Sequence, residues 1–260
     1  TMKALVPHLE NVIKTAVGMP SKLGCAGVLV NLATRHSFVF RPHADQFLKL
    51  IEKAVLDRNS TVSASYAKAA GYLARLASDA QLLRLATFTK SLYFSAESEA
   101  HRQVCAEILN AVSKHASDRF NSLAAEFLPF VFFAKHDFDE QVRELCEKTW
   151  DENVGGSRAV LMYLTEIINL SSDKLDSAKW TIKHTAALTI ADVVSSAQTE
   201  LGQGNAKLIW PALEGSLKLK TFEGKERVIN AFVQFTKNGK AFWSADSKIS
   251  ELMTKIAIRE

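Results

Sequence analysis

The feature that most constrains the fold of this chain is an amphipathic helical hairpin that recurs along it. Residues 118–154 show the hairpin most clearly. In its first half the apolar residues lie three or four apart on one helical face: Phe120, Leu123, Phe127, Val131 and Ala134. Lys135-His136-Asp137 interrupts the pattern, and a second apolar face follows: Val142, Leu145, Cys146, Thr149 and Trp150. Neither helix can bury its apolar face alone, so each is expected to pack on its partner and on the next hairpin.

The hairpins recur about every 40 residues, the period of HEAT repeats. Equivalent positions of the second helices are Gly27, Tyr66, Ala106, Cys146 and Ala186. We predict an all-α fold, an α-solenoid of about six HEAT-like helical hairpins plus one extra C-terminal helix, as a single continuous array over residues 1–260. The expected helix pairs are about 2–36, 43–77, 79–116, 118–154, 157–197 and 206–238, with a lone helix at 246–258. First helices are expected on the outer, convex side and second helices on the inner side.

Turn residues mark the first hairpin. Gly18 is suited to a helix C-cap, and Pro20 to the first position of the next helix, where a missing N–H costs no hydrogen bond. The second helix carries small residues that are expected to let another helix approach closely: Gly24, Ala26, Gly27 and Ala33.

Composition argues against several classes of protein. The net charge of +4 is small for a dedicated nucleic-acid binder. No apolar run approaches the roughly 20 residues that span a bilayer, and no signal peptide is expected at the N-terminus. Cys25, Cys105 and Cys146 are widely spaced and never form Cys-x-x-Cys. This spacing indicates reduced, buried thiols in a cytosolic or nuclear protein rather than a disulfide framework.

Two stretches of the chain contain specific motifs. One is Val17-Gly18-Met19-Pro20-Ser21-Lys22-Leu23-Gly24-Cys25-Ala26, a glycine-x-proline turn before a helix beginning Lys-x-Gly-Cys-Ala. The other is Trp150-x-Glu152-Asn153-Val154, followed by Gly156-Ser157. Both resemble motifs of one family, the very large HEAT-repeat adaptor and scaffold protein of the proteasome, the second being similar to its Trp-x-Glu-Asn-Val-x-Gly-Ser. Asp57-Arg58-Asn59 and Leu128-Pro129 are also similar, and Pro129 is expected to kink its helix. The resemblance covers most of the chain and fades after about Leu201.

The resemblance implies a fragment from the C-terminal half of a protein several times this length. It implies a non-enzymatic adaptor of the cytoplasm and nucleus that links the proteasome's regulatory particle to its core particle and monitors assembly. The implied partners are subunits of both particles, with no nucleic acid, small-molecule substrate or cofactor. Arg143 resembles the arginine that HEAT repeats pair with an aspartate of a neighbouring turn, and Lys22 and Lys183 are candidates for the same ladder. We interpret five residues as structural: Gly18, Pro20, Gly24, Arg143 and Trp150.

Other HEAT proteins remain as alternatives. A tubulin-binding TOG domain has a similar length and about six helix pairs, and presents tryptophan and basic residues on the loops within its pairs. The first two such loops here, Gly18-Met19-Pro20 and Asp57-Arg58-Asn59, contain no tryptophan. Nuclear transport receptors and phosphatase scaffold subunits share the architecture but not the two similar stretches.

The candidate partner-binding residues form a basic region near the end of the chain: Lys218, Lys220, Lys225, Arg227, Lys237 and Lys240. Phe242 and Trp243 lie close by. One interpretation of this region is a docking patch for an acidic protein or membrane surface. The alternative is a solvated face whose two aromatic residues belong to the core.

The sequence gives only weak signals of a catalytic or metal-binding site. His101 lies four residues before Cys105, so one helical face brings them together, but a nucleophilic cysteine needs an open, electropositive site. Core burial of Cys105 is the preferred interpretation. The seven histidines show no metal-ligand spacing, and we predict no metal site. Asp137, Asp139 and Glu140 open a helix, where carboxylates act as caps.

Overall fold

The computed structural model describes residues 2–95, 98–154, 158–197 and 201–259, and every regular element in them is helical. Gly156, Ser157 and the predicted start of the fifth pair at 157 lie outside these residues. Two compact units are present. Unit 1 comprises Thr1–Val131 and Asp139–Asn153, and unit 2 comprises Phe132–Phe138 and Val154–Glu260.

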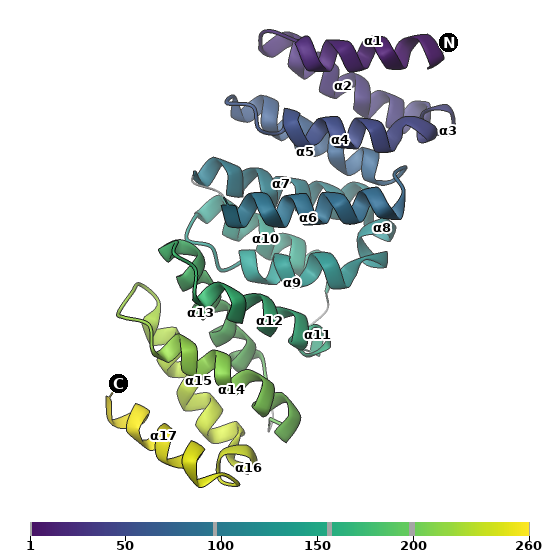
Figure 1. Ribbon diagram of the computed structural model, residues 1–260. Helices are drawn as coiled ribbons and strands as arrows, with labels where there is room; N and C mark the ends of the chain where they lie inside the picture. The colour runs from purple at the N-terminus through teal and green to yellow at the C-terminus, as the bar shows by residue number, and fades with distance from the viewer. Residues whose placement is uncertain (1, 96–97, 155–157, 198–200, 260) are drawn as a thin grey trace. The chain divides into compact units, whose positions relative to one another are not determined.

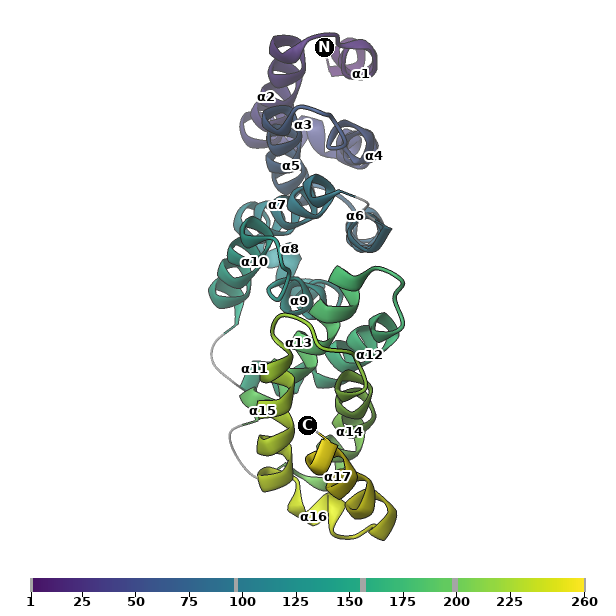
Figure 2. The same cartoon turned by 90° about the vertical axis from the view of Figure 1, so that its left-hand side faces the viewer.

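Unit 1 consists of helix pairs stacked one on another (Figure 1). Its first helices are α1 (Met2–Thr15), α4 (Ala44–Ala54), α6 (Asp79–Ser95) and α9 (Ala124–Ala134), of which the last turn of α9 belongs to unit 2. Its second helices are α2 (Met19–Arg35), α5 (Ser60–Ala74), α7 (Glu99–His115) and α10 (Glu140–Asn153). Short helices join consecutive pairs: α3 (Ser37–Phe40), η1 (Arg41–His43) and α8 (Ser117–Ser122). Within the unit the two sets of helices form two layers (Figure 2).

Unit 2 continues the same pattern of pairing. The short helix α11 (Arg158–Met162) precedes α12 (Leu164–Leu175), which pairs with α13 (Trp180–Ser196). The next pair is α14 (Gln203–Leu217) and α15 (Lys225–Asn238). The chain then forms α16 (Lys240–Trp243) and α17 (Ser247–Arg259).

The predicted fold class is confirmed: the chain is all-α, with HEAT-like helix pairs and one further helix, α17. The pairs agree with the predicted spans to within a few residues. The single continuous array over residues 1–260 stays a prediction, as does the assignment of convex and inner sides. No single helix in the described residues is long and apolar enough to cross a membrane. Only Met19–Arg35 and Ser37–Ala54, taken together across a 113° bend, reach the required length and composition.

Polar side chains connect each pair of unit 1 to the next pair about one repeat later in the sequence. In the second-helix layer, Asn110 Nδ2 donates to Thr149 Oγ1 at 3.0 Å. Asn153 Nδ2 donates to Ser113 Oγ at 2.6 Å. The partners are 39 and 40 residues apart, which matches the predicted repeat. These bonds fix the register between α7 and α10.

The turns within pairs carry a second set of links between neighbours. Lys22 of α2 forms an ion pair with Asp57, which lies in the turn between α4 and α5. Lys22 was a candidate for this kind of link between neighbouring turns. Gln103 Nε2 of α7 donates to Asp139 Oδ2 of the following turn at 3.1 Å. The pairing of Arg143 and Lys183 with an aspartate stays a prediction. Arg143 lies half-buried in the first turn of α10, and Trp150 is buried in the same helix.

Asp139 also caps α10, as predicted, because its Oδ1 accepts the Val142 N–H at 2.9 Å. Replacing Asp139 by alanine removes this cap and the bond from Gln103 together. We expect a loss of about 1 to 2 kcal/mol in the free energy of unfolding, measured by urea denaturation. Glu140→Ala is the matched control, since that carboxylate is exposed in the first turn of α10, where favourable interaction with the helix dipole is worth about 0.5 kcal/mol. Equal losses in the two variants would contradict the capping role.

In unit 2 three aromatic residues, each 42 positions after the last, mark equivalent turns: Phe138, Trp180 and Phe222. The rings of Phe138 and Trp180 are 5.4 Å apart between centroids. His184 bridges the rest of the series, at 5.7 Å from Trp180 and stacked on Phe222 at 4.1 Å. Contacts between these rings therefore join three successive turns of the unit.

Two details of the first hairpin differ from the prediction. Gly18 does not cap α1, which ends at Thr15; its φ of 86° places it in the left-handed region, immediately before α2. Pro20 does occupy the first turn of α2, as expected. The first helix of the fourth pair is also divided, because α8 ends and α9 begins on either side of Leu123. A kink at Pro129 itself stays a prediction.

The small residues of α2 were expected to let another helix approach closely. For Gly24 and Gly27 this expectation was wrong. Both are exposed, and a Cβ on either would meet no atom within 4 Å. Ala26 is buried. Close approach occurs instead at Gly71 of α5, where an added Cβ would lie 2.3 Å from the carbonyl oxygen of Ala111 in α7.

Candidate functional site

The predicted basic region lies in unit 2, but helical geometry divides it. Lys218 and Lys220 lie at the end of α14 and in the loop after it, and Arg227 lies in the first turn of α15. Lys237 and Lys240 lie at the other end of α15. With a rise of about 1.5 Å per residue, the two ends of this helix are about 20 Å apart. These five side chains are exposed and form two clusters rather than one patch.

Lys225, the remaining member, faces the interior of unit 2 and is only 7% exposed. Its Nζ donates to the carbonyl oxygens of Leu217 at 2.7 Å and Leu219 at 2.8 Å, and lies 3.3 Å from that of Ser216. These carbonyls at the end of α14 have no next helical turn to bond them. Lys225 therefore secures the α14–α15 turn and is not placed to contact a partner.

Phe242 and Trp243 are half-buried and pack against α15. The Trp243 Nε1–H donates to the Thr236 carbonyl at 2.9 Å. The rings of Phe242 and Phe235 meet edge to face at 6.1 Å. This packing agrees with the alternative in which both residues belong to the core.

All three cysteines are buried. Cys105 is fully buried in α7, where its Sγ lies 3.3 Å from the Thr89 carbonyl oxygen. Burial raises the pKa of the Cys105 thiol well above its usual range. His101, one turn away, is half-buried. Cys105 is thus a core residue, as preferred from the sequence.

The three carboxylates that open α10 do not converge on a site. Asp139 is the helix cap, Glu140 is exposed, and Asp137 is buried in the turn. Across the described ranges, no group of three or more His, Cys, Asp or Glu side chains has the geometry to hold a metal ion.

A partly buried ionic cluster lies where the end of α9 meets α13 in unit 2. Asp192 Oδ2 is 3.1 Å from both Lys135 Nζ and His136 Nε2. Burial lowers the pKa of His136 and outweighs the attraction of Asp192, with Lys135 and Arg227 opposing the positive charge. Burial alone raises the pKa of Asp192, but its contacts with His136 and Lys135 prevail and hold that pKa far below the usual range. The cluster joins two consecutive repeats.

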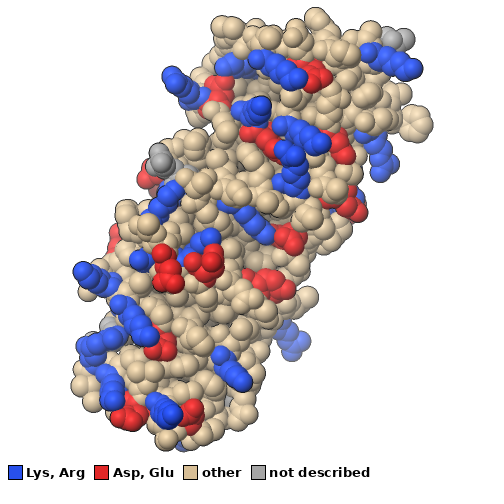
Figure 3. Space-filling view, viewed as in Figure 1, with Lys and Arg blue, Asp and Glu red and all other residues tan. Residues whose placement is uncertain are grey.

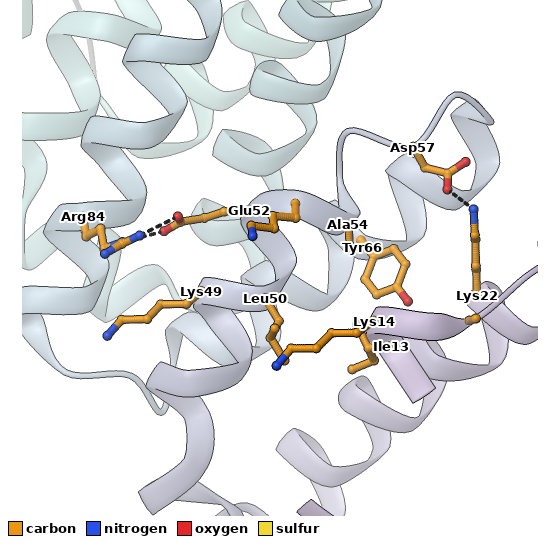
Figure 4. A pocket seen from close by; sticks show the side chains of 12 residues that line it. Ile13, Lys14, Lys22, Lys49, Leu50, Glu52, Ala54, Asp57, Tyr66 and Arg84 are labelled. Atoms are coloured by element: carbon orange, nitrogen blue, oxygen red, sulfur yellow. Dashed lines mark hydrogen bonds and ion pairs between the residues drawn. The ribbon is translucent and has the colours of Figure 1, made fainter. Parts of the chain in front are cut away.

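Unit 1 contains a concave site, which we call the α4 groove. It has a volume of about 710 Å³ and is lined by residues of α1, α2, α4, α5 and α6 and by the turns after α1 and α4. Figure 4 shows its side chains: Ile13, Lys14, Lys22, Lys49, Leu50, Glu52, Ala54, Asp57, Tyr66 and Arg84. Ala16 and Lys53 complete the lining. Stacking of α1 and α6 on either side of α4 creates the hollow.

Ion pairs define the edges of the α4 groove. Arg84 holds Glu52 through two nitrogens, Nε and Nη2, each 3.0 Å from a different carboxylate oxygen. Lys22 holds Asp57, and together with the Asn59 N–H it lowers the pKa of that carboxyl. Figure 3 shows Lys and Arg side chains on this side of the molecule, with Asp and Glu side chains among them.

Tyr66 lies at the inner end of the α4 groove and is only 2% exposed. Burial raises its pKa, with Cys25 and Asp57 nearby adding to the effect, so its hydroxyl stays neutral. Burial also raises the pKa of the Cys25 thiol. The inner end of the groove is therefore uncharged, and the charges lie at its edges.

Similarity to known proteins identifies the family. Residues 1–94 match the family model for the proteasome adapter and scaffold protein ECM29, HEAT-repeat domain. Proteasome component ecm29 of Schizosaccharomyces pombe is 30% identical over 238 residues, covering 90% of this chain and 14% of that protein. The proteasome adapter and scaffold protein ECM29 of Homo sapiens is 29% identical over 234 residues, covering 87% and 13%. The chain belongs to the ECM29 family.

A third relative, proteasome component ECM29 of Saccharomyces cerevisiae, is 24% identical over 237 residues, covering 90% of this chain and 13% of that protein. The chain thus spans about one-seventh of the length of the ECM29 relatives it matches. Membership of the ECM29 family confirms the resemblance inferred from residues 17–26 and 150–154. Every residue that lines the α4 groove falls within the part matched by the ECM29 model.

The α4 groove was not predicted from the sequence. Its lysines follow the polar side of an ordinary amphipathic helix, opposite the buried Phe47, Leu48 and Ile51. That pattern is the same for any solvated face. Only the stacking of helices that are about 35 residues apart in sequence shows that some of these lysines border a hollow.

Proposed function

We propose that this chain is a non-enzymatic adaptor segment that binds the proteasome in the cytoplasm and nucleus. As part of a longer protein, it helps to link the regulatory particle to the core particle and acts in assembly quality control. The observation that carries this proposal is the match of 87–90% of the chain to relatives named as proteasome components or adapters. The partners are then subunits of the two particles.

The side chains of the described residues support a role for the surface rather than for catalysis. The one cysteine that has a histidine on its helical face is sealed in the core, with a thiol that resists ionisation. The carboxylates of the α9–α10 turn serve the fold. What the helix pairs expose instead is a long series of charged side chains, which gives selectivity and fast association in protein binding.

The basic cluster at the α14–α15 loop provides a direct test in the tagged full-length parent protein. We expect the triple variant K218E/K220E/R227E to recover about tenfold less proteasome in an affinity purification, because reversed charges repel an acidic partner surface. Lys225 is left intact, since its replacement disturbs the fold. The variant K237E/K240E, at the other end of α15, is the matched control. Unchanged recovery with the triple variant would remove this cluster from the interface.

A further inference from the structure

The α4 groove has the size of a ligand-binding site. Its volume of about 710 Å³ is in the range of pockets that enclose small ligands or several side chains of a peptide. It is bounded by residues of two consecutive helix pairs and of the first helix of a third. Links between these pairs, such as Lys22 with Asp57 and Arg84 with Glu52, hold its edges in place.

The charges in the α4 groove leave a local positive excess. Its two acids, Glu52 and Asp57, are each held by a cation. Lys14 is paired with Glu10 at 2.6 Å. Lys49 and Lys53 are exposed, and neither has a carboxylate or carbonyl partner among the residues that the structure describes. They lie one helical turn apart on α4, with Cβ atoms about 6 Å from each other.

Apolar side chains lie between the charged edges. Ile13 and Ala16, at the end of α1, line the groove together with Leu50 and Ala54 of α4, and all four are only half-buried. Their surface is available to an apolar side chain of a ligand, with the neutral Tyr66 at the inner end. A ligand that uses the whole groove therefore needs both negative charge and an apolar group.

We propose that the α4 groove binds an acidic peptide segment of a partner protein, with its carboxylates on Lys49 and Lys53 and an aliphatic side chain on the apolar surface. Carboxylates two residues apart in an extended peptide are about 7 Å apart, which suits the two lysines. A phosphate ligand fits less well, because the planar donor fork of Arg84 is already engaged by Glu52. The inference concerns unit 1 and does not depend on the basic cluster of unit 2 or on the proteasome being the source of the peptide.

Fluorescence anisotropy with the full-length protein tests the proposal, using a labelled peptide Gly-Ser-Glu-Ser-Glu-Leu-Ser-Gly as the probe. We expect saturable binding that weakens with added salt. The variant K49E/K53E should weaken it at least tenfold, and replacing leucine by serine in the peptide should weaken it several-fold. The matched control is K68E/K114E, which reverses two exposed lysines on α5 and α7 outside the groove and should leave binding unchanged.

Three outcomes would overturn the proposal: no peptide binding, equal binding to the two double variants, or binding only to anionic vesicles of phosphatidylserine and phosphatidylcholine. Circular dichroism of each variant separates a lost site from a lost fold. Because proteasome recovery is measured separately, failure of peptide binding leaves the adaptor function intact, and failure of the adaptor function leaves the groove intact.

Discussion

Replacing Gly71 by alanine is expected to lower the free energy of unfolding by about 3 kcal/mol, at the upper end of the usual cost of overpacking. The new Cβ would lie 2.3 Å from the carbonyl oxygen and 2.5 Å from the carbonyl carbon of Ala111. Those atoms are backbone of a helix and cannot rotate away. Helices α5 and α7 must therefore move apart, which opens gaps among the buried side chains on both.

Gly27→Ala is the control for Gly71→Ala. Gly27 also lies within a second helix, but a Cβ there meets nothing within 4 Å. Alanine loses less conformational freedom than glycine on folding, so we expect this variant to gain about 0.5 to 1 kcal/mol. Urea denaturation followed by circular dichroism measures both. If Gly71→Ala and Gly27→Ala changed the free energy of unfolding in the same direction, α5 and α7 would not approach each other as closely as described.

Replacing Asp192 by alanine is expected to cost about 3 kcal/mol, because it leaves Lys135 and His136 without the carboxylate between them. Lys135 and Asp192 are each less than a quarter exposed, so water compensates only in part. Asp192→Asn keeps the shape and removes the charge, and should cost less than alanine. Urea denaturation at neutral pH provides the measurement. A change under 1 kcal/mol for Asp192→Ala would contradict a structural role for the cluster.

The same cluster predicts that stability falls on acidification. The pKa of His136 is lowered in the folded chain, so below about pH 6.5 the unfolded chain takes up a proton that the folded chain resists. The pKa of Asp192 is also lowered, so its contribution is complete above about pH 4 and is lost as the pH falls further. Both effects have the same sign. Denaturation midpoints between pH 7.5 and 5 should decline, and in His136→Phe that decline should be smaller.

The sequence predicted the helix pairs well because two independent signals agree on them. Apolar spacing marks each helix, and residues such as Pro20 and Asp139 mark the starts. In the first pair, the prediction of which residue of the second helix faces the core was wrong by one position. Tyr66, Ala106, Cys146 and Ala186 are buried at equivalent positions, whereas Gly27 is exposed and its neighbour Ala26 takes the buried place. A run of small residues has too little apolar contrast to fix the facing of a helix.

The surfaces were harder to predict. Six basic residues within 23 positions suggested one patch, yet the length of α15 divides them and burial removes Lys225. The α4 groove and the close contact at Gly71 depend on neighbours about 40 residues away. A pattern within one helix carries no information about such neighbours. Periodicity therefore predicts the repeats, whereas stacking determines what the repeats expose.

We propose that these repeats work as a binding surface of a proteasome adaptor. Affinity purification of the tagged full-length parent protein, with the co-purifying proteins identified and quantified by mass spectrometry, tests it most directly. We predict that subunits of both the regulatory and the core particle are enriched far above an untagged control, and that the enrichment declines in K218E/K220E/R227E. Recovery of proteasome subunits at the level of the untagged control would contradict the claim.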